Sequence, residues 1–145
     1  NKMSIRDSLI ILSEEQALTA TADSEDVIDL GAGYDAWGAV VAAPELGEGR
    51  PLWLNVMVSK VLASAGKAAT LTVKFMTGTA ATCTTTVFST EALAEAVLVA
   101  GYCIASVPLP MGLNRYIKLT YTVGVENFTS GAVSAWIGFE PYKAA

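Results

Sequence analysis

Histidine is absent from this 145-residue sequence, and charged residues are scarce at 16%. The lack of histidine removes the commonest general base, metal ligand and catalytic-triad member. The nine Lys and Arg residues are scattered and outnumbered by fourteen acidic residues, which gives a net charge of -5. Phosphate backbones need clustered cations, so no nucleic-acid partner is predicted. No apolar run reaches the roughly 18 residues of a membrane span, so no membrane partner is predicted either.

Cysteine is also rare, with only Cys83 and Cys103. The two thiols could pair, but reduced, buried thiols are the simpler interpretation for a protein made in a cytoplasm. That site of synthesis is expected because residues 1–7 lack the apolar core of a signal peptide. The cysteine spacing is not that of a zinc site.

Known catalytic and ligand-binding patterns are missing too. Gly31-Ala32-Gly33 does not meet the phosphate-loop or dinucleotide pattern. Most acidic residues fall in predicted loops and are interpreted as solvated surface, although a two-carboxylate hydrolase stays open as an alternative. We therefore predict that the chain is not an enzyme and has no cofactor and no metal.

Apolar residues, by contrast, make up 52% of the chain, and the mean hydropathy is +0.45. Alanine accounts for much of this fraction, yet the remainder predicts apolar surface that a partner covers. An oligomer or assembly subunit is the favoured interpretation. The length predicts one domain, residues 9–145, preceded by a polar N-terminal arm, residues 1–8.

Alternation with a period of two predicts the strands. Residues 115–123 and 133–139 alternate, and the Gly- and Asn-containing loop between them predicts an antiparallel pair. Residues 52–61 and 69–77 predict another hairpin, with Leu54, Val56, Leu71, Val73 and Phe75 facing the core. Shorter strands are expected at 17–22, 27–30 and 102–109.

Helix signals are weak. Ser13-Glu14-Glu15-Gln16 could cap one helical turn, and residues 91–99 could form a turn or two. Many short strands with little or no helix predict an all-β sandwich or barrel.

Exposed aromatic residues and unusual charges supply the candidate interaction sites. The Gly- and Pro-rich segment 31–51 is a long loop of the kind that carries function. Trp53 and Trp136 are predicted to point outward from their strands. Arg115 lies in phase with an apolar face and is either paired or a trimer or capsid contact. The full set of predicted interface residues is Arg6, Tyr34, Trp37, Leu46, Trp53, Arg115, Trp136, Phe139 and Tyr142.

Ten short segments, in order along the chain, match a known pattern. They are 8–10, 16–21, 27–33, 49–52, 69–73, 98–102, 114–116, 121–124, 128–129 and 131–135. Together they resemble the jelly-roll capsid cement (decoration) proteins of tailed bacteriophages. Residues 34–48 and the charged start depart from that pattern.

The resemblance implies an antiparallel jelly-roll β-sandwich of about eight strands. It further implies a homotrimer on the outer capsid surface of the virion, at threefold and quasi-threefold positions of the expanded head. Its partners would be the major capsid protein and other copies of itself, and its role would be to stabilise the shell. A jelly-roll module that binds carbohydrate or a host surface is the alternative, because one scaffold hosts many roles.

Overall fold

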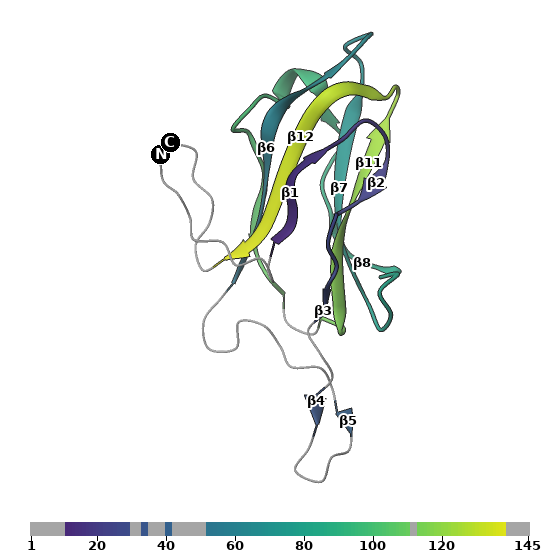
Figure 1. Cartoon of the computed structure of the whole chain (residues 1–145), viewed down its shortest axis with the longest axis vertical. Coiled ribbons are helices and arrows are strands. Elements are labelled where there is room, and N and C mark those ends of the chain that lie inside the picture. The colour runs from purple at the N-terminus through teal and green to yellow at the C-terminus, as the bar shows by residue number, and fades with distance from the viewer. Residues whose placement is uncertain (1–10, 30–32, 35–39, 42–51, 111–112, 139–145) are drawn as a thin grey trace.

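The computed structural model describes residues 11–29, 33–34, 40–41, 52–110 and 113–138. Two antiparallel sheets pack face to face (Figure 1). Sheet A has the order β1 (Ile11–Ala17), β12 (Phe128–Gly138), β6 (Trp53–Ser64) and β10 (Cys103–Pro108). Sheet B has the order β2 (Ala22–Asp23), β11 (Tyr116–Gly124), β7 (Thr70–Gly78) and β8 (Thr85–Ser89), with β3 (Ile28–Asp29) beside β11 and β9 (Leu93–Ala94) beside β7. The predicted all-β sandwich is confirmed.

Helix is nearly absent from the described residues, where one 3-10 turn, η2 (Glu95–Val97), occupies the predicted helical stretch. Within the long segment 31–51, β4 (Gly33–Tyr34) pairs with β5 (Val40–Val41). Seven of the described strands have five or more residues, close to the predicted eight. The predicted arm, residues 1–8, lies outside the described residues.

The core lies between the sheets and consists of the alternating residues of four long strands. The inward faces predicted from the alternation are confirmed, because these residues are all buried: Leu54, Val56 and Val58 in β6, Val133, Ala135 and Ile137 in β12, Leu71, Val73 and Phe75 in β7, and Ile117, Leu119 and Tyr121 in β11. Burial of a large apolar side chain contributes about 1.5–3 kcal/mol, so these rows hold the two sheets together.

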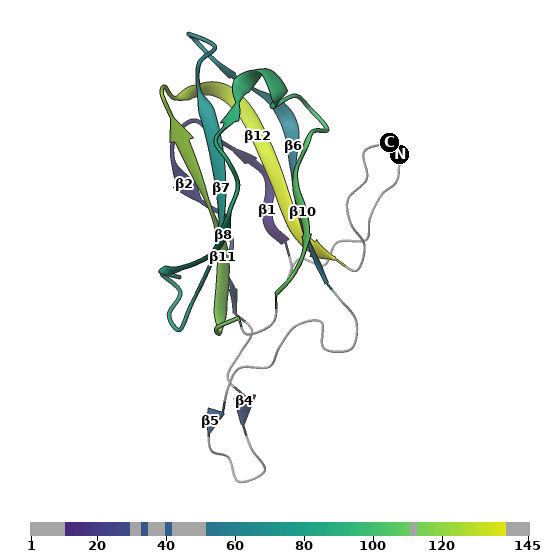
Figure 2. The same cartoon turned by 180° about the vertical axis from the view of Figure 1, so that it is seen from behind.

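The predicted hairpins, however, are wrong. β12 pairs with β6 and β11 pairs with β7, so both expected pairs are divided between the sheets. The connections after β6 and after β11 are arches that pass from sheet A to sheet B and back (Figures 1 and 2). Alternation identifies the buried side of a strand, and two strands facing each other across a core show the same alternation as two strands side by side.

The predicted helix cap at Ser13 is also wrong, because residues 11–17 form β1. Two irregularities in register let this edge strand point polar side chains inward. Ser13 Oγ donates to Gln16 Oε1 at 2.8 Å and accepts from the Tyr121 hydroxyl at 2.8 Å. Gln16 Nε2 donates to the carbonyl oxygen of Asp23 at 2.8 Å. This polar network links β1 in sheet A with β2 and β11 in sheet B.

The two remaining short strands are shorter than predicted. The strand expected at 17–22 is divided, because β1 ends at Ala17 and β2 begins at Ala22 in the other sheet. The strand expected at 27–30 is β3, Ile28–Asp29.

Candidate functional site

Several of the predicted interface residues fall where no side chain is described. Arg6, Trp37, Leu46, Phe139 and Tyr142 lie outside the described residues, and these predictions stay open. Tyr34 contributes its backbone to β4.

The two strand tryptophans differ in exposure. Both belong to the row of their strand that points away from the core, as predicted, and Trp53 is half-buried. Trp136 is nevertheless buried, because only 4% of this residue is accessible. β12 is a central strand, and Ile11 and Asn55 stand directly beside Trp136 on its two neighbours. The indole also extends over Gly138, where a side chain would meet it at 3.6 Å.

Arg115 is paired. Its Nε lies 2.8 Å from Asp29 Oδ1 and its Nη2 lies 3.0 Å from Asp29 Oδ2, a bidentate geometry. The guanidinium carbon also lies 5.0 Å from the centre of the Tyr116 ring. The pairing interpretation is confirmed, and the pair ties the start of β11 to β3.

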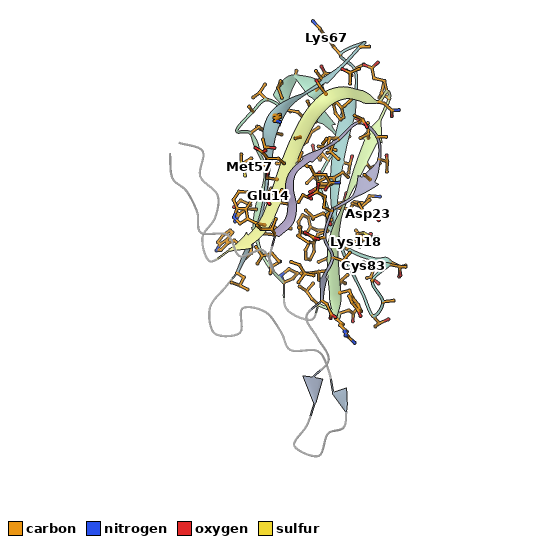
Figure 3. All side chains as sticks on the ribbon, in the orientation of Figure 1. Glu14, Asp23, Met57, Lys67, Cys83 and Lys118 are labelled. Carbon is orange, nitrogen blue, oxygen red and sulfur yellow. The ribbon has the colours of Figure 1, made fainter. Side chains whose placement is uncertain are left out.

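In sheet A the edge strand β1 carries the exposed Glu14 and Glu15, whereas the three strands beyond it carry little charge. β10 and β12 contain no charged residue, and β6 contains only Lys60. The residues that alternate away from the core on these three adjacent strands include the half-buried Trp53, Met57 and Ser106 and the buried Asn55 and Ser134. Ser106 Oγ donates to Asn55 Oδ1 at 2.8 Å, so this polar pair is satisfied within the sheet. We call this surface the uncharged face; Met57 lies on it (Figure 3).

Sheet B carries charge and threonine on its outer face. Lys118 Nζ lies 2.9 Å from Asp23 Oδ2, and Thr120 Oγ1 lies 3.0 Å from Asp23 Oδ1 (Figure 3). The hydrogen bond from Lys118 is the main reason that the pKa of Asp23 is below its ordinary value. Lys74 and Thr72 continue the polar row along β7, both half-buried. This outer face is therefore polar, with Lys118 largely buried beside Asp23.

One end of the sandwich is organised around Ser64. We call it the arch end and define it by the connections 65–69 and 125–127 together with the segment 95–101. Ser64 Oγ donates to Glu126 Oε1 at 2.6 Å and also contacts the carboxylate of Glu95. The Glu126 carboxylate further accepts from the backbone N–H of Ala68 at 2.9 Å and of Gly66 at 3.1 Å. The hydrogen bond from Ser64 is the main reason that the pKa of Glu126 is below its ordinary value, and the two backbone hydrogen bonds lower this pKa further. Glu126 thus clamps one arch to the other.

The arch end presents apolar side chains to solvent, which the sequence analysis did not identify. Val61, Val97, Val99 and Val125 are 52%, 41%, 50% and 81% exposed. Val125 has a φ of 67°, and the N–H of Glu126 donates to the carbonyl oxygen of Gly124 at 2.8 Å. This is a γ-turn with a left-handed central residue, a strained form that costs about 1–3 kcal/mol for a β-branched side chain. The sequence signal for this strained turn is Val125 itself, because a turn position of this kind ordinarily has Gly or Asn.

Groups that could support chemistry are few in the described part of the chain. No three Cys, Asp or Glu residues there lie close enough together to hold a metal ion. Cys83 and Cys103 are both free thiols, and burial raises the pKa of each. None of the described helices is long and apolar enough to cross a membrane.

Comparison with known proteins identifies one family. No curated protein matches the chain. The family model Bbp16 matches residues 12–137, which include both sheets of the sandwich and the arch end. The chain therefore belongs to the Bbp16 family, a phage-associated protein family.

Proposed function

We propose that this chain is a capsid cement protein. In this proposal it forms a homotrimer that binds the outside of the expanded phage head and bridges neighbouring major capsid subunits. The observation that carries the proposal is the combination of a phage-associated family with a sandwich in which two strands of one sheet, β10 and β12, contain no charged residue. A protein that works by contact needs one surface for its neighbours and another for water.

The uncharged face suits contact between copies of the chain. Each copy has a net charge of -5, so two copies repel each other unless they approach through surfaces that contribute no charge. β10 and β12 contain no charged residue, and the accessible part of this face comes from half-buried residues such as Trp53, Met57 and Ser106, since Ser134 and Trp136 of β12 are buried. Interface cores are depleted of charge and enriched in Trp and Met. We therefore assign the trimer contact to this face.

The mechanism is selective binding to one state of the shell. A protein that binds the expanded lattice and not the unexpanded one stabilises the expanded lattice by the free energy of its binding. Three copies joined in one trimer also raise the apparent affinity, because the second and third contacts become intramolecular. No chemical step is needed.

Two measurements test the proposal. The first is co-sedimentation of the purified protein with expanded and unexpanded shells of the virus that encodes it. Saturable binding to the expanded shells alone is expected. Absence of binding to either kind of shell would reject the cement role, and glycan binding by the same protein would then favour the host-surface alternative.

The second measurement is the mass of the protein in solution by light scattering. The wild-type chain is expected to be a trimer. Met57→Lys places a charge on the uncharged face and is expected to dissociate the trimer. Thr72→Lys adds the same charge to an equally half-buried site on sheet B and is the matched control. A trimer that survives Met57→Lys unchanged contradicts the assignment of this face.

A further inference from the structure

The arch end is a rigid platform. Ser64 joins its three segments, because its hydroxyl contacts both Glu126 of one arch and Glu95 of η2. Leu98 anchors the third segment: its side chain is completely buried, and its carbonyl oxygen accepts from the N–H of Leu62 at 3.1 Å. In Figures 1 and 2 both arches and the helical turn lie together at the upper end of the sandwich. Side chains presented here are held in place before any partner arrives.

Exposed apolar side chains concentrate on this platform. Five large apolar side chains are exposed among the described residues. Val97, Val99 and Val125 belong to the arch end, and Val61 lies near the end of β6, which leads into it. Val27, the fifth, precedes β3. Lys60 and Lys67, which lie in or next to the same segments, are exposed too, and the carboxylates of Glu95 and Glu126 meet at Ser64. A concentration of exposed apolar side chains on one part of a protein is typical of a contact site.

Val125 differs from the other exposed valines in both exposure and backbone conformation. It is the most exposed of the four valines, and it occupies a γ-turn whose backbone conformation disfavours a β-branched side chain. Asn or Gly would relieve the strain without loss of any contact to the core. A strained residue persists where the surroundings hold it, and here the adjacent Glu126 is fixed by three hydrogen bonds. Because Val125 is 81% exposed, its side chain gains little from packing in the isolated chain, and a contact with a partner would offset the strain.

We propose that the arch end contacts the protein lattice of the expanded head, an inference that rests on the proposed function. The size of the surface selects this occupant. Taken together, four valines at these exposures present apolar area on the order of 300 Å². A stable interface between two free proteins buries about 800 Å² on each partner. This summed area is too small to hold a second copy in solution, but it suffices for a contact repeated three times per trimer on a fixed lattice.

The test separates strain from binding. Val125→Asn keeps a side chain, tolerates the left-handed backbone and removes the apolar contact. The variant is expected to unfold at the wild-type temperature or a few degrees above it. Its affinity for expanded shells is expected to be lower than that of the wild-type protein by up to about tenfold. Val27→Asn, at an exposed valine outside the arch end, is the control and is expected to match the wild-type protein in binding. Val99→Ser is a second variant of the platform and is expected to weaken binding as Val125→Asn does.

The measured outcomes distinguish failure of the proposed contact from failure of the proposed function. Shell binding that is unchanged in both Val125→Asn and Val99→Ser overturns the platform and leaves the cement role intact. A Val125→Asn protein that unfolds well below the wild-type temperature overturns it too, because the valine would then serve the fold. Wild-type protein that binds no shell rejects the proposed function, and this inference with it.

Discussion

Gly131→Ala is expected to be among the most damaging single-methyl changes available in this chain. Gly131 lies in β12 with a φ of 127°, and its register with β6 is irregular on both sides. A methyl group there would stand 2.7 Å from Leu62 Cα, 2.9 Å from the carbonyl oxygen of Val61 and 2.4 Å from Leu62 Cδ2. The first two are backbone atoms, so the strands themselves have to move apart. The Gly131 carbonyl oxygen also accepts from the N–H of Leu18 at 3.2 Å, and that bond would move with it.

The expected cost has two parts. Placing a non-glycine residue at this φ costs about 1–2 kcal/mol. The overlap with β6 adds about 1–3 kcal/mol, as overpacking of a tight core does. A total of about 2–5 kcal/mol is a large share of the 5–15 kcal/mol that a typical domain has. Gly101→Ala is the matched control, because Gly101 has a φ of 87° and nothing within 4 Å of the added methyl. Gly101→Ala is therefore expected to show only the cost of the backbone conformation and none from overlap.

Urea unfolding followed by tryptophan fluorescence measures both variants, since Trp53 and Trp136 lie on the two strands that Gly131 brings together. With a slope of about 2 kcal/mol/M, the midpoint of Gly131→Ala is expected about 1–2.5 M below the wild-type value. That of Gly101→Ala is expected to fall by about 0.5–1 M. All samples need the same protomer concentration, because association shifts the apparent stability. Equal midpoints for the two variants would refute the steric argument.

Three further changes test other parts of the fold. Tyr121→Phe removes the hydroxyl that donates to Ser13 and should lower the free energy of unfolding by about 1–2 kcal/mol in urea titrations. Because burial raises the pKa of Tyr121, wild-type stability should fall as the pH rises above about 10, where the unfolded tyrosine ionises, and Tyr121→Phe should weaken that fall. Asp23→Asn should cost about 1 kcal/mol at pH 7, because it removes the acceptor of the mostly buried Lys118. Since the pKa of Asp23 is lowered, its contribution is present above about pH 4 and disappears as the pH falls further, so thermal melts of wild type and variant should converge in acid. Leu98→Ala should cost about 2–5 kcal/mol and should increase proteolysis within 95–101, and an unchanged digestion pattern would contradict the anchoring role of Leu98.

The composition and alternation of the sequence were enough to predict the fold class and the buried rows. Leu54, Val56 and Val58, for example, all face the core as expected. The pairing of strands was not predictable in this way, because Val123 and Val133 alternate identically whether their strands are neighbours or face each other. The arches carry turn residues such as Gly124 and Asn127 that also suit hairpins, so local chemistry does not separate the two arrangements.

The candidate sites were predicted less well because exposure depends on neighbours. Trp136 has the correct outward phase, yet its position on a central strand between Ile11 and Asn55 buries it. Ser13 and Gln16 look like a helix cap in sequence, but Tyr121, far along the chain, supplies the partner that draws Ser13 inward. Val125 was missed because an exposed valine in a turn is unremarkable until its backbone angle is known.

The two arches also determine how the chain can fold. In the sandwich, β7 and β8 are the only consecutive described strands that hydrogen-bond to each other. Other contacts join distant segments, as where Thr129 bonds Ala63 across 66 positions and Ser13 bonds Tyr121 across 108. Such a topology has little local structure from which to start, and proteins of this kind fold in milliseconds to seconds rather than microseconds. During that time the apolar rows of β6 and β12 are open to misassociation. A chain with this topology therefore has to complete its sandwich before these apolar rows are protected from misassociation.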